Sequence, residues 1–478
     1  MSIKEKALSG LFWAAIQQFS TQGISFAVSL ILSRLLLPAE FGTIALLSVF
    51  ISLGIVLMES GLGQSLIRTT NPTIEDYSTV FYFNLAGSII IYGIIYFCAP
   101  FIADFYKQNS LEKIVRWYGL IFISNALSSI HFTRLTKEMQ FKKELTITIP
   151  SLILSGIIGI TMAYWGYGVW SLVASGLSQS MAVAFQMWIR SDWAPIFKFN
   201  KEKFKYHFQY GYKLTLSGIL DTLFTNAYVI IIGKFFAPAQ VGFYNRADTL
   251  KQLPVSNISS ILNKVTFPLF AEVKDDNVRL KEMYQKIMQM VLFFVAPILL
   301  IMSALAEPLF RFLFTDKWLP AVPYFQIICW GGILYPIHAY NLNILKVKGR
   351  SDLFLKLEVL KKIIFVLAIG FSFKFGIYGL LYSGIMISIV AFFINTYYSG
   401  KFINYNSWNQ ITDILPILLM ATLVGTIVFY CDSRLFHEFS DFTRLFFGAS
   451  MGLLFYLFLV KFFRISALPE LIQIIRKQ

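Results

Sequence analysis

Long apolar runs alternate with short polar segments along almost the whole chain. A helix needs about 20 mostly apolar residues to cross a bilayer, and charged clusters and Pro or Gly breaks divide the 478 residues into fourteen runs of about that length. The stretch from Leu145 to Ile189 has no charge over 45 residues, so it must hold two helices, with a turn at 165–168. The predicted spans are 9–33, 41–66, 79–99, 115–133, 146–165, 167–189, 213–236, 240–268, 287–306, 322–345, 359–374, 376–399, 413–431 and 445–463.

The composition supports the same fold class. Hydrophobic residues make up 56% of the chain and charged residues only 14%, against about 25% charged residues in soluble domains. A soluble protein of this size could not bury so much apolar surface. These values exclude a cytosolic enzyme, a disordered chain and a secreted disulfide scaffold. They predict an all-α polytopic membrane protein with about 14 transmembrane helices.

The net charge of +15 has two possible meanings, a nucleic-acid surface or basic cytoplasmic loops. With the N-terminus inside, 28 of the 41 Lys and Arg residues fall in inner segments, 10 in outer segments and three within span 240–268. This bias favours an even number of spans, with both termini cytoplasmic and no nucleic-acid partner.

An internal repeat relates the two parts of the chain. The segment 35–42, Leu-Leu-Leu-Pro-Ala-Glu-Phe-Gly, matches 235–242, Phe-Phe-Ala-Pro-Ala-Gln-Val-Gly, at an offset of 200 residues. Both copies lie between an odd and an even span. We therefore expect a six-helix bundle in 1–200, its repeat in 201–400, and two additional helices with a cytoplasmic tail in 401–478.

Polar side chains recur at helical spacing on corresponding spans of the two bundles, which favours a hydrophilic central cavity. Other interpretations stay open: Ser and Thr often serve helix packing, Lys264 and Glu59 could reach the membrane surface, and Arg246 could be an interface anchor. The candidate substrate-binding residues are Arg246, Lys264, Asn257, Asp221, Glu59, Gln18 and Gln22.

A basic stripe in a cavity has a chemical use, because Arg and Lys bind phosphate and diphosphate groups. Carboxylates such as Asp221 and Glu59 could pair with these cations, or titrate if ions drive transport. The sequence has no GxxxxGK[ST] motif, no metal-ligand spacing among its four histidines and three cysteines, and no nucleophile elbow. It therefore predicts no catalytic residue, no metal site and no cofactor.

Several segments resemble Wzx-type polysaccharide flippases, the O-antigen, colanic-acid and lipopolysaccharide exporters of the multidrug/oligosaccharidyl-lipid/polysaccharide exporter superfamily. These segments are 32–42, 59–67 (Glu-Ser-Gly-Leu-Gly-Gln-Ser-Leu-Ile), 166–172 and 241–247 (Val-Gly-Phe-Tyr-Asn-Arg-Ala), followed by Gln-Leu-Pro at 252–254. The resemblance implies two six-helix bundles around a central cavity, with the two last helices helping to accommodate a lipid tail. Among the basic candidates, only Arg246 aligns with a recognisable motif.

The function implied by the resemblance is transfer of undecaprenyl-diphosphate-linked oligosaccharide from the inner to the outer leaflet of a bacterial inner membrane. Membrane lipids, and H+ or Na+ as a coupling ion, would be further partners. One alternative is a multidrug exporter of the same superfamily. Another is a membrane polysaccharide polymerase or ligase, although such enzymes usually carry their chemistry on a large outer loop and the predicted outer loops are short.

Overall fold

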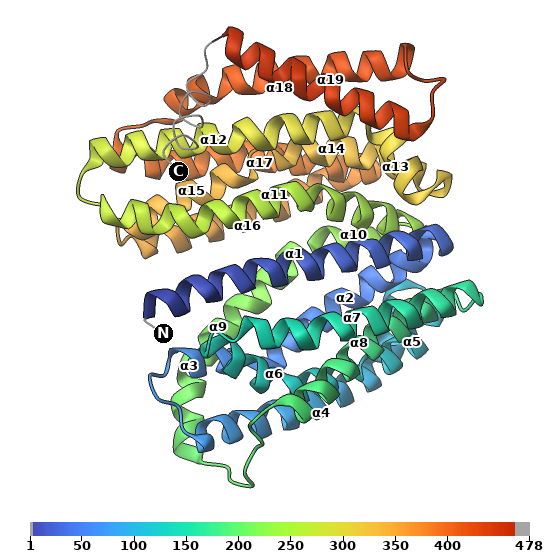
Figure 1. Ribbon diagram of the computed structural model, residues 1–478, viewed down its shortest axis with the longest axis vertical. Helices are drawn as coiled ribbons and strands as arrows, with labels where there is room; N and C mark the ends of the chain where they lie inside the picture. The colour runs from blue at the N-terminus through green and yellow to red at the C-terminus, as the bar shows by residue number, and fades with distance from the viewer. Residues whose placement is uncertain (1–2, 464–478) are drawn as a thin grey trace. The chain divides into compact units, whose positions relative to one another are not determined.

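The computed structural model describes residues 3–463, apart from the side chains of 3–9, 11, 260–265, 267 and 268. Within this range the chain forms helices and no strand (Figure 1). The helices are α1 (Ile3–Leu35), α2 (Pro38–Glu59), α3 (Leu62–Arg68), α4 (Ile74–Tyr106), α5 (Ser110–Tyr118), α6 (Ile121–Lys137), α7 (Phe141–Tyr164), α8 (Val169–Arg190), α9 (Lys201–Thr225), α10 (Ala227–Phe235), α11 (Pro238–Glu272), α12 (Asn277–Ala304), α13 (Ala306–Phe314), η1 (Asp316–Ala321), α14 (Val322–Gly332), α15 (Tyr335–Val347), α16 (Ser351–Ser372), η2 (Phe373–Phe375), α17 (Gly376–Ile403), α18 (Ser407–Arg434) and α19 (Asp441–Phe462).

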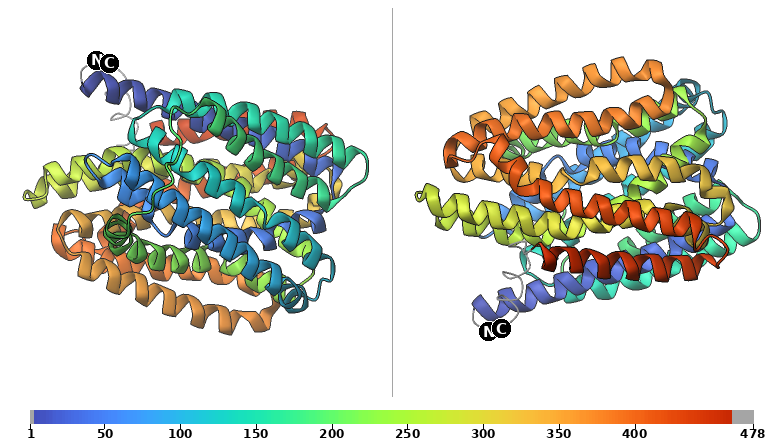
Figure 2. Two further views of the ribbon diagram at one scale, coloured as in Figure 1. Left: turned by 90° about the horizontal axis from the view of Figure 1, so that it is seen from below. Right: turned by 90° about the horizontal axis from the view of Figure 1, so that it is seen from above.

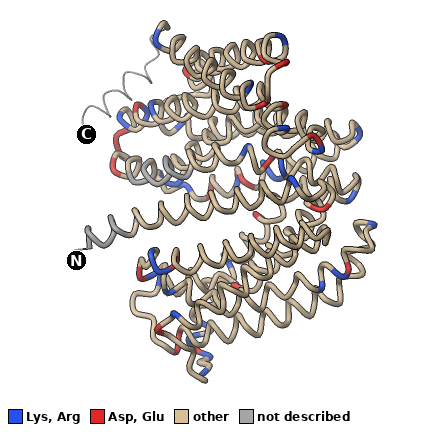
Figure 3. The backbone as a smooth tube through the Cα atoms, turned by 45° about the vertical axis from the view of Figure 1, so that its right-hand side comes forward, with Lys and Arg blue, Asp and Glu red and all other residues tan. Residues whose placement is uncertain are grey.

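The fourteen predicted spans all fall on one helix or on two successive helices. Among the described residues, eight helical segments are long and apolar enough to cross a membrane, and α9 with α10 forms a ninth if this pair, bent by 49°, is one span. Figure 3 shows long stretches of helix without a charged residue. The prediction of an all-α polytopic membrane protein is confirmed.

Several helices differ in detail from the predicted spans. Spans 41–66, 115–133, 213–236 and 322–345 are each built from two helices, and α13 with η1 was not predicted. Helix α4 runs beyond both ends of its predicted span. At its N-terminus, Thr73 and Asp76 form a capping box that starts the helix five residues earlier. The predicted turn at 165–168 is confirmed, with Gly166 and Gly168 at φ of +82° and +57°.

The chain forms two compact units, unit 1 (Met1–Gly242) and unit 2 (Phe243–Gln478). In unit 1, α7 packs along α8 and α1, α4 packs on α5 and α6, and α9 packs on α2, α3 and α4. In unit 2, α12 packs along α18, and α17 packs on α14, α15 and α16, while α18 and α19 form a hairpin (Figure 2). The predicted division into 1–200, 201–400 and 401–478 stays a prediction.

The two copies of the repeated motif meet within unit 1. A Cβ added to Gly42 would lie 1.9 Å from the Pro238 carbonyl oxygen, and one added to Gly242 would lie 2.0 Å from that of Pro38. The contact is therefore reciprocal: each glycine lies against the proline of the other copy. Only glycine permits such a close approach of two backbones.

Candidate functional site

Arg246 is buried among aromatic rings in unit 2. Its side chain is 6% exposed, and its guanidinium carbon lies 5.0 Å from the ring centre of Phe314 and 5.2 Å from that of Trp318. Both rings are fully buried, at the end of α13 and in η1. Cation–π contacts of this kind hold an arginine in one position. This burial does not fit an arginine that anchors the protein at the membrane surface.

The other basic residues predicted within span 240–268 are Lys251 and Lys264. Lys251 donates from Nζ to Asp248 Oδ1 at 2.5 Å, an i,i+3 pair whose spacing is visible in the sequence but which was not among the predicted site contacts. Asn257 donates from Nδ2 to the Leu253 carbonyl oxygen at 2.8 Å. Lys264 lies in α11, but its side chain is outside the described residues.

The remaining candidates are spread over unit 1. Gln18 is exposed and Gln22 half-buried on α1, and Asp221 is exposed on α9. On the same helix, Gln17 donates from Nε2 to Glu144 Oε1 of α7 at 2.6 Å. Their assignment to a substrate site stays a prediction.

Glu59 lines a polar pocket of about 440 Å³ in unit 1. It is the last residue of α2, and the turn at Ser60 and Gly61 separates this helix from α3. The rest of the wall comes mainly from α3, α4 and α6: Gly61, Gly63, Gln64, Ile67, Asn84, Asn125, Ser128, Ser129, Phe132, Thr133 and Thr136. The polar residues of α4 and α6 were not predicted as site residues.

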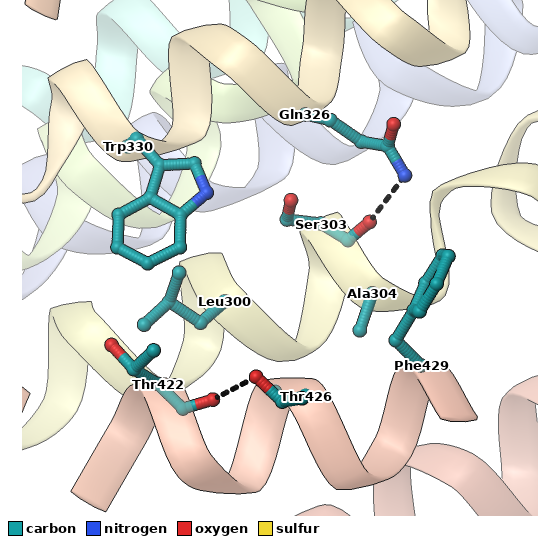
Figure 4. A pocket seen from close by; sticks show the side chains of 9 residues that line it. Leu300, Ser303, Ala304, Gln326, Trp330, Thr422, Thr426 and Phe429 are labelled. Atoms are coloured by element: carbon teal, nitrogen blue, oxygen red, sulfur yellow. Dashed lines mark hydrogen bonds between the residues drawn. The ribbon is translucent and has the colours of Figure 1, made fainter. Parts of the chain in front are cut away.

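A second pocket, of about 300 Å³, lies in unit 2 between α12, α14 and α18 (Figure 4). Gln326 Nε2 donates to the Ser303 carbonyl oxygen at 3.3 Å, and Thr426 Oγ1 donates to that of Thr422 at 2.9 Å. None of its lining residues is charged. Gln326 thus donates to the backbone of the neighbouring α12 and Thr426 to the backbone of its own helix, and the wall carries no charged side chain.

Unit 1 contains a hydrogen-bonded chain of Ser65, His207 and Asp76, residue types that can form a catalytic triad. Ser65 Oγ lies 2.8 Å from His207 Nδ1, and Asp76 Oδ1 lies 3.3 Å from His207 Nε2. Ser65 is 1% exposed and His207 is completely buried, so no substrate reaches the hydroxyl. The chain connects α3, α4 and α9 and is structural.

Metal-ligand clusters are absent from the described residues, where no three His, Cys, Asp or Glu side chains come close enough to hold a metal ion. The three cysteines, Cys98, Cys329 and Cys431, are free thiols. Of the charged candidates, Arg246 is buried against aromatic rings, whereas Glu59 is exposed at the wall of the polar pocket.

Comparisons with known proteins extend over almost the full length. The chain is similar to the teichuronic acid biosynthesis protein TuaB of Bacillus subtilis (strain 168), with 25% identity over 98% of this chain and 97% of TuaB. It is similar to the lipopolysaccharide biosynthesis protein WzxC of Escherichia coli (strain K12), with 23% identity over 77% of this chain and 75% of WzxC.

In fold, the chain is similar to a structure of the lipid II flippase MurJ in an inward closed conformation. The TM-score is 0.74 at 14% identity, covering 95% of this chain and 99% of MurJ. The model of the family described as polysaccharide biosynthesis protein matches residues 31–323. This match spans more than half of the chain, which therefore belongs to the polysaccharide biosynthesis protein family.

Proposed function

We propose that the chain is a flippase that moves an oligosaccharide linked to undecaprenyl diphosphate across a bacterial inner membrane. Two relatives are named for the biosynthesis of teichuronic acid and lipopolysaccharide, and the structural neighbour is named a lipid II flippase. The observation that carries the proposal is that helices take up almost the whole described chain. Among the described residues, the longest segment between two helices is 191–200, which is too short for an enzymatic domain, so transport fits better than catalysis.

The proposed direction is from the cytoplasmic to the outer leaflet by alternating access, with both termini in the cytoplasm. The excess of basic residues in the predicted inner segments supports this orientation. A diphosphate group carries negative charge that a bilayer excludes, so its passage requires a cationic host. H+ or Na+ is proposed as the coupling ion.

Arg246 is proposed as the main contact of the diphosphate. A guanidinium can donate two parallel hydrogen bonds to phosphate oxygens, and the rings of Phe314 and Trp318 hold this one in place. Lys264 is proposed as a second cation, with Asn257, Gln18 and Gln22 as polar contacts to the sugar. Asp221 and Glu59 are proposed to balance the charge of these cations.

The test is transport in liposomes that contain purified protein and a lipid-linked oligosaccharide, with the outer-leaflet fraction measured by periodate oxidation. We expect Arg246→Gln to weaken the apparent substrate affinity about tenfold to hundredfold, the value of a lost charged hydrogen-bond pair. The matched control is Arg350→Gln, since the Arg350 side chain is partly exposed and paired with Asp352.

Two results would contradict the proposal. One is liposomes that show no protein-dependent transfer of any lipid-linked oligosaccharide. The other is a deletion strain with normal surface polysaccharide and altered drug resistance, which would favour a multidrug exporter. Transfer that persists unchanged in Arg246→Gln would remove only the role of Arg246.

A further inference from the structure

The polar pocket of unit 1 lies at a break in a predicted membrane span. Helix α2 ends at Glu59, Ser60 and Gly61 both have left-handed backbone angles, with φ of +45° and +63°, and α3 begins at Leu62. No described residue donates a hydrogen bond to the carbonyl oxygen of Met58 or Glu59. The C-terminal end of a helix carries a partial negative charge, and such ends coordinate cations in transporters with broken helices.

The hydroxyl groups of α6 in the pocket wall donate their hydrogen bonds to backbone carbonyl oxygens. Ser128 Oγ donates to the carbonyl oxygen of Asn125 at 3.2 Å, and Thr133 Oγ1 donates to that of Ser129 at 3.0 Å. Ser129 Oγ likewise donates to a carbonyl oxygen, that of Ala126, at 3.3 Å. Because each hydroxyl has one proton and two lone pairs, what these groups still offer is acceptor capacity.

Asn84 also offers an acceptor oxygen to the pocket and is fully buried. It is 1% exposed, and its Nδ2 donates to Ser129 Oγ at 3.3 Å. Its Oδ1 has no hydrogen-bond partner in the described part of the chain. A buried amide oxygen without a partner costs free energy, so a ligand that accepts its lone pair would be favoured.

Glu59 is the single charged residue in the wall of the pocket, and no ion pair or hydrogen bond of its carboxylate exists among the described residues. Two basic side chains of the neighbouring α6 are occupied elsewhere. Lys137 Nζ donates to the carbonyl oxygens of Leu66 and Ile67, at 3.1 and 2.9 Å. Arg134 pairs with Glu138 at 3.3 Å.

We propose that this pocket binds a hydrated monovalent metal cation, for which Na+ is the probe. The ligands are the Glu59 carboxylate, the Asn84 amide oxygen and the α6 hydroxyl oxygens, all hard oxygen donors that suit alkali and alkaline-earth ions. One carboxylate neutralises one positive charge, whereas a divalent ion usually takes more acidic ligands than this wall provides. The volume of about 440 Å³ leaves room for water molecules that complete the coordination. This site rests on the proposed function in one respect, since it would hold the proposed coupling ion, and its occupancy is tested without substrate.

The experiment is thermal unfolding of the full-length protein in lipid nanodiscs, followed by tryptophan fluorescence in NaCl or in choline chloride of equal ionic strength. At Na+ concentrations about ten to a hundred times Kd, we expect Tm to rise by about 2–4 °C. The reason is that a ligand that binds only the folded state stabilises it. Glu59→Gln keeps the shape of the side chain and should abolish the shift. Asn84→Ala should weaken Na+ binding about tenfold.

The matched control is Glu112→Gln, which removes an acid of unit 1 that pairs with Arg116 at 2.8 Å away from the pocket. It should keep the full Na+ shift. Binding of radioactive 22Na+ to the same samples gives a second readout, in case a variant is unstable.

Three outcomes would overturn the proposal. The first is equal stability in NaCl and choline chloride with no 22Na+ bound. The second is a Tm that follows pH but not Na+, which would make Glu59 a protonation site. The third is stabilisation by free saccharides, lost in Glu59→Gln, which would make this a sugar pocket. Failure of transport in liposomes with Na+ binding intact would instead concern the flippase function alone.

Discussion

Two carboxylates in this protein occupy opposite chemical settings. Asp432 of α18 is 4% exposed and accepts two hydrogen bonds from Arg444 of α19, at 2.9 and 2.7 Å. Glu59 of α2 lines a pocket and has no partner among the described residues. The Asp432 carboxylate links α18 to α19. The Glu59 carboxylate can bind a ligand that enters the pocket. This difference distinguishes a binding group from a structural charge.

The largest expected effect comes from breaking the Asp432–Arg444 pair. Arg444→Ala leaves a buried carboxylate without its cation, which costs about 3–5 kcal/mol of unfolding free energy. The measurement is thermal or denaturant unfolding in detergent micelles.

Two variants of the same hairpin check the cause. Arg434→Ala removes an exposed arginine of α18 and should change stability by less than about 0.5 kcal/mol. Replacing both partners, Asp432→Leu with Arg444→Met, should recover most of the loss, because no buried charge then remains. Equal loss in the single and the double variant would mean that packing, and not charge, dominates this contact.

An intermediate effect is expected where α9 meets the turn beside Glu59. A Cβ added to Gly211 would lie 2.2 Å from the Ser60 carbonyl oxygen, a backbone atom that can only move with the turn. Gly211→Ala should cost about 1–3 kcal/mol as an overpacked contact, and it should also reduce the Na+ shift. Gly93→Ala, where nothing lies within 4 Å of the added atom, is the control and should be neutral or slightly stabilising. A full Na+ shift in Gly211→Ala would show that the pocket does not depend on the turn.

The smallest expected effect is that of Glu59→Gln in buffer without Na+. Since no described partner is lost, the free energy of unfolding should change by less than about 0.5 kcal/mol. This value is obtained from the choline chloride samples described above. A loss as large as that of Arg444→Ala would mean that Glu59 is a structural charge, and the contrast between the two carboxylates would disappear.

The sequence predicted the helices well and their breaks poorly. Runs of apolar residues identify a membrane segment, but a change of direction inside it leaves the composition the same. The bend of 49° between α9 and α10 falls at Asn226, a residue that ordinary helices also contain. The turn at Gly166 and Gly168 was readable because two nearby glycines interrupt an apolar run.

The candidate site was predicted unevenly for a similar reason. Single charged residues such as Glu59 and Arg246 are visible in an apolar run, whereas the groups that surround them come from helices distant in sequence. Asn125, Ser128 and Ser129 share one face of span 115–133 at i, i+3 and i+4. That polar face is visible in the sequence as a signal for the pocket. Only the fold shows that it lies beside Asn84 of α4.

The reciprocal contact of Pro38 with Gly242 and of Pro238 with Gly42 has an evolutionary consequence. The same patch meets itself, as at the two-fold axis of a homodimer, although both copies now belong to one polypeptide. A larger residue at either glycine would collide with the backbone of the other copy. The two positions, 200 residues apart in the chain, are therefore not free to diverge independently, and a duplicated gene would retain here a trace of its original symmetry.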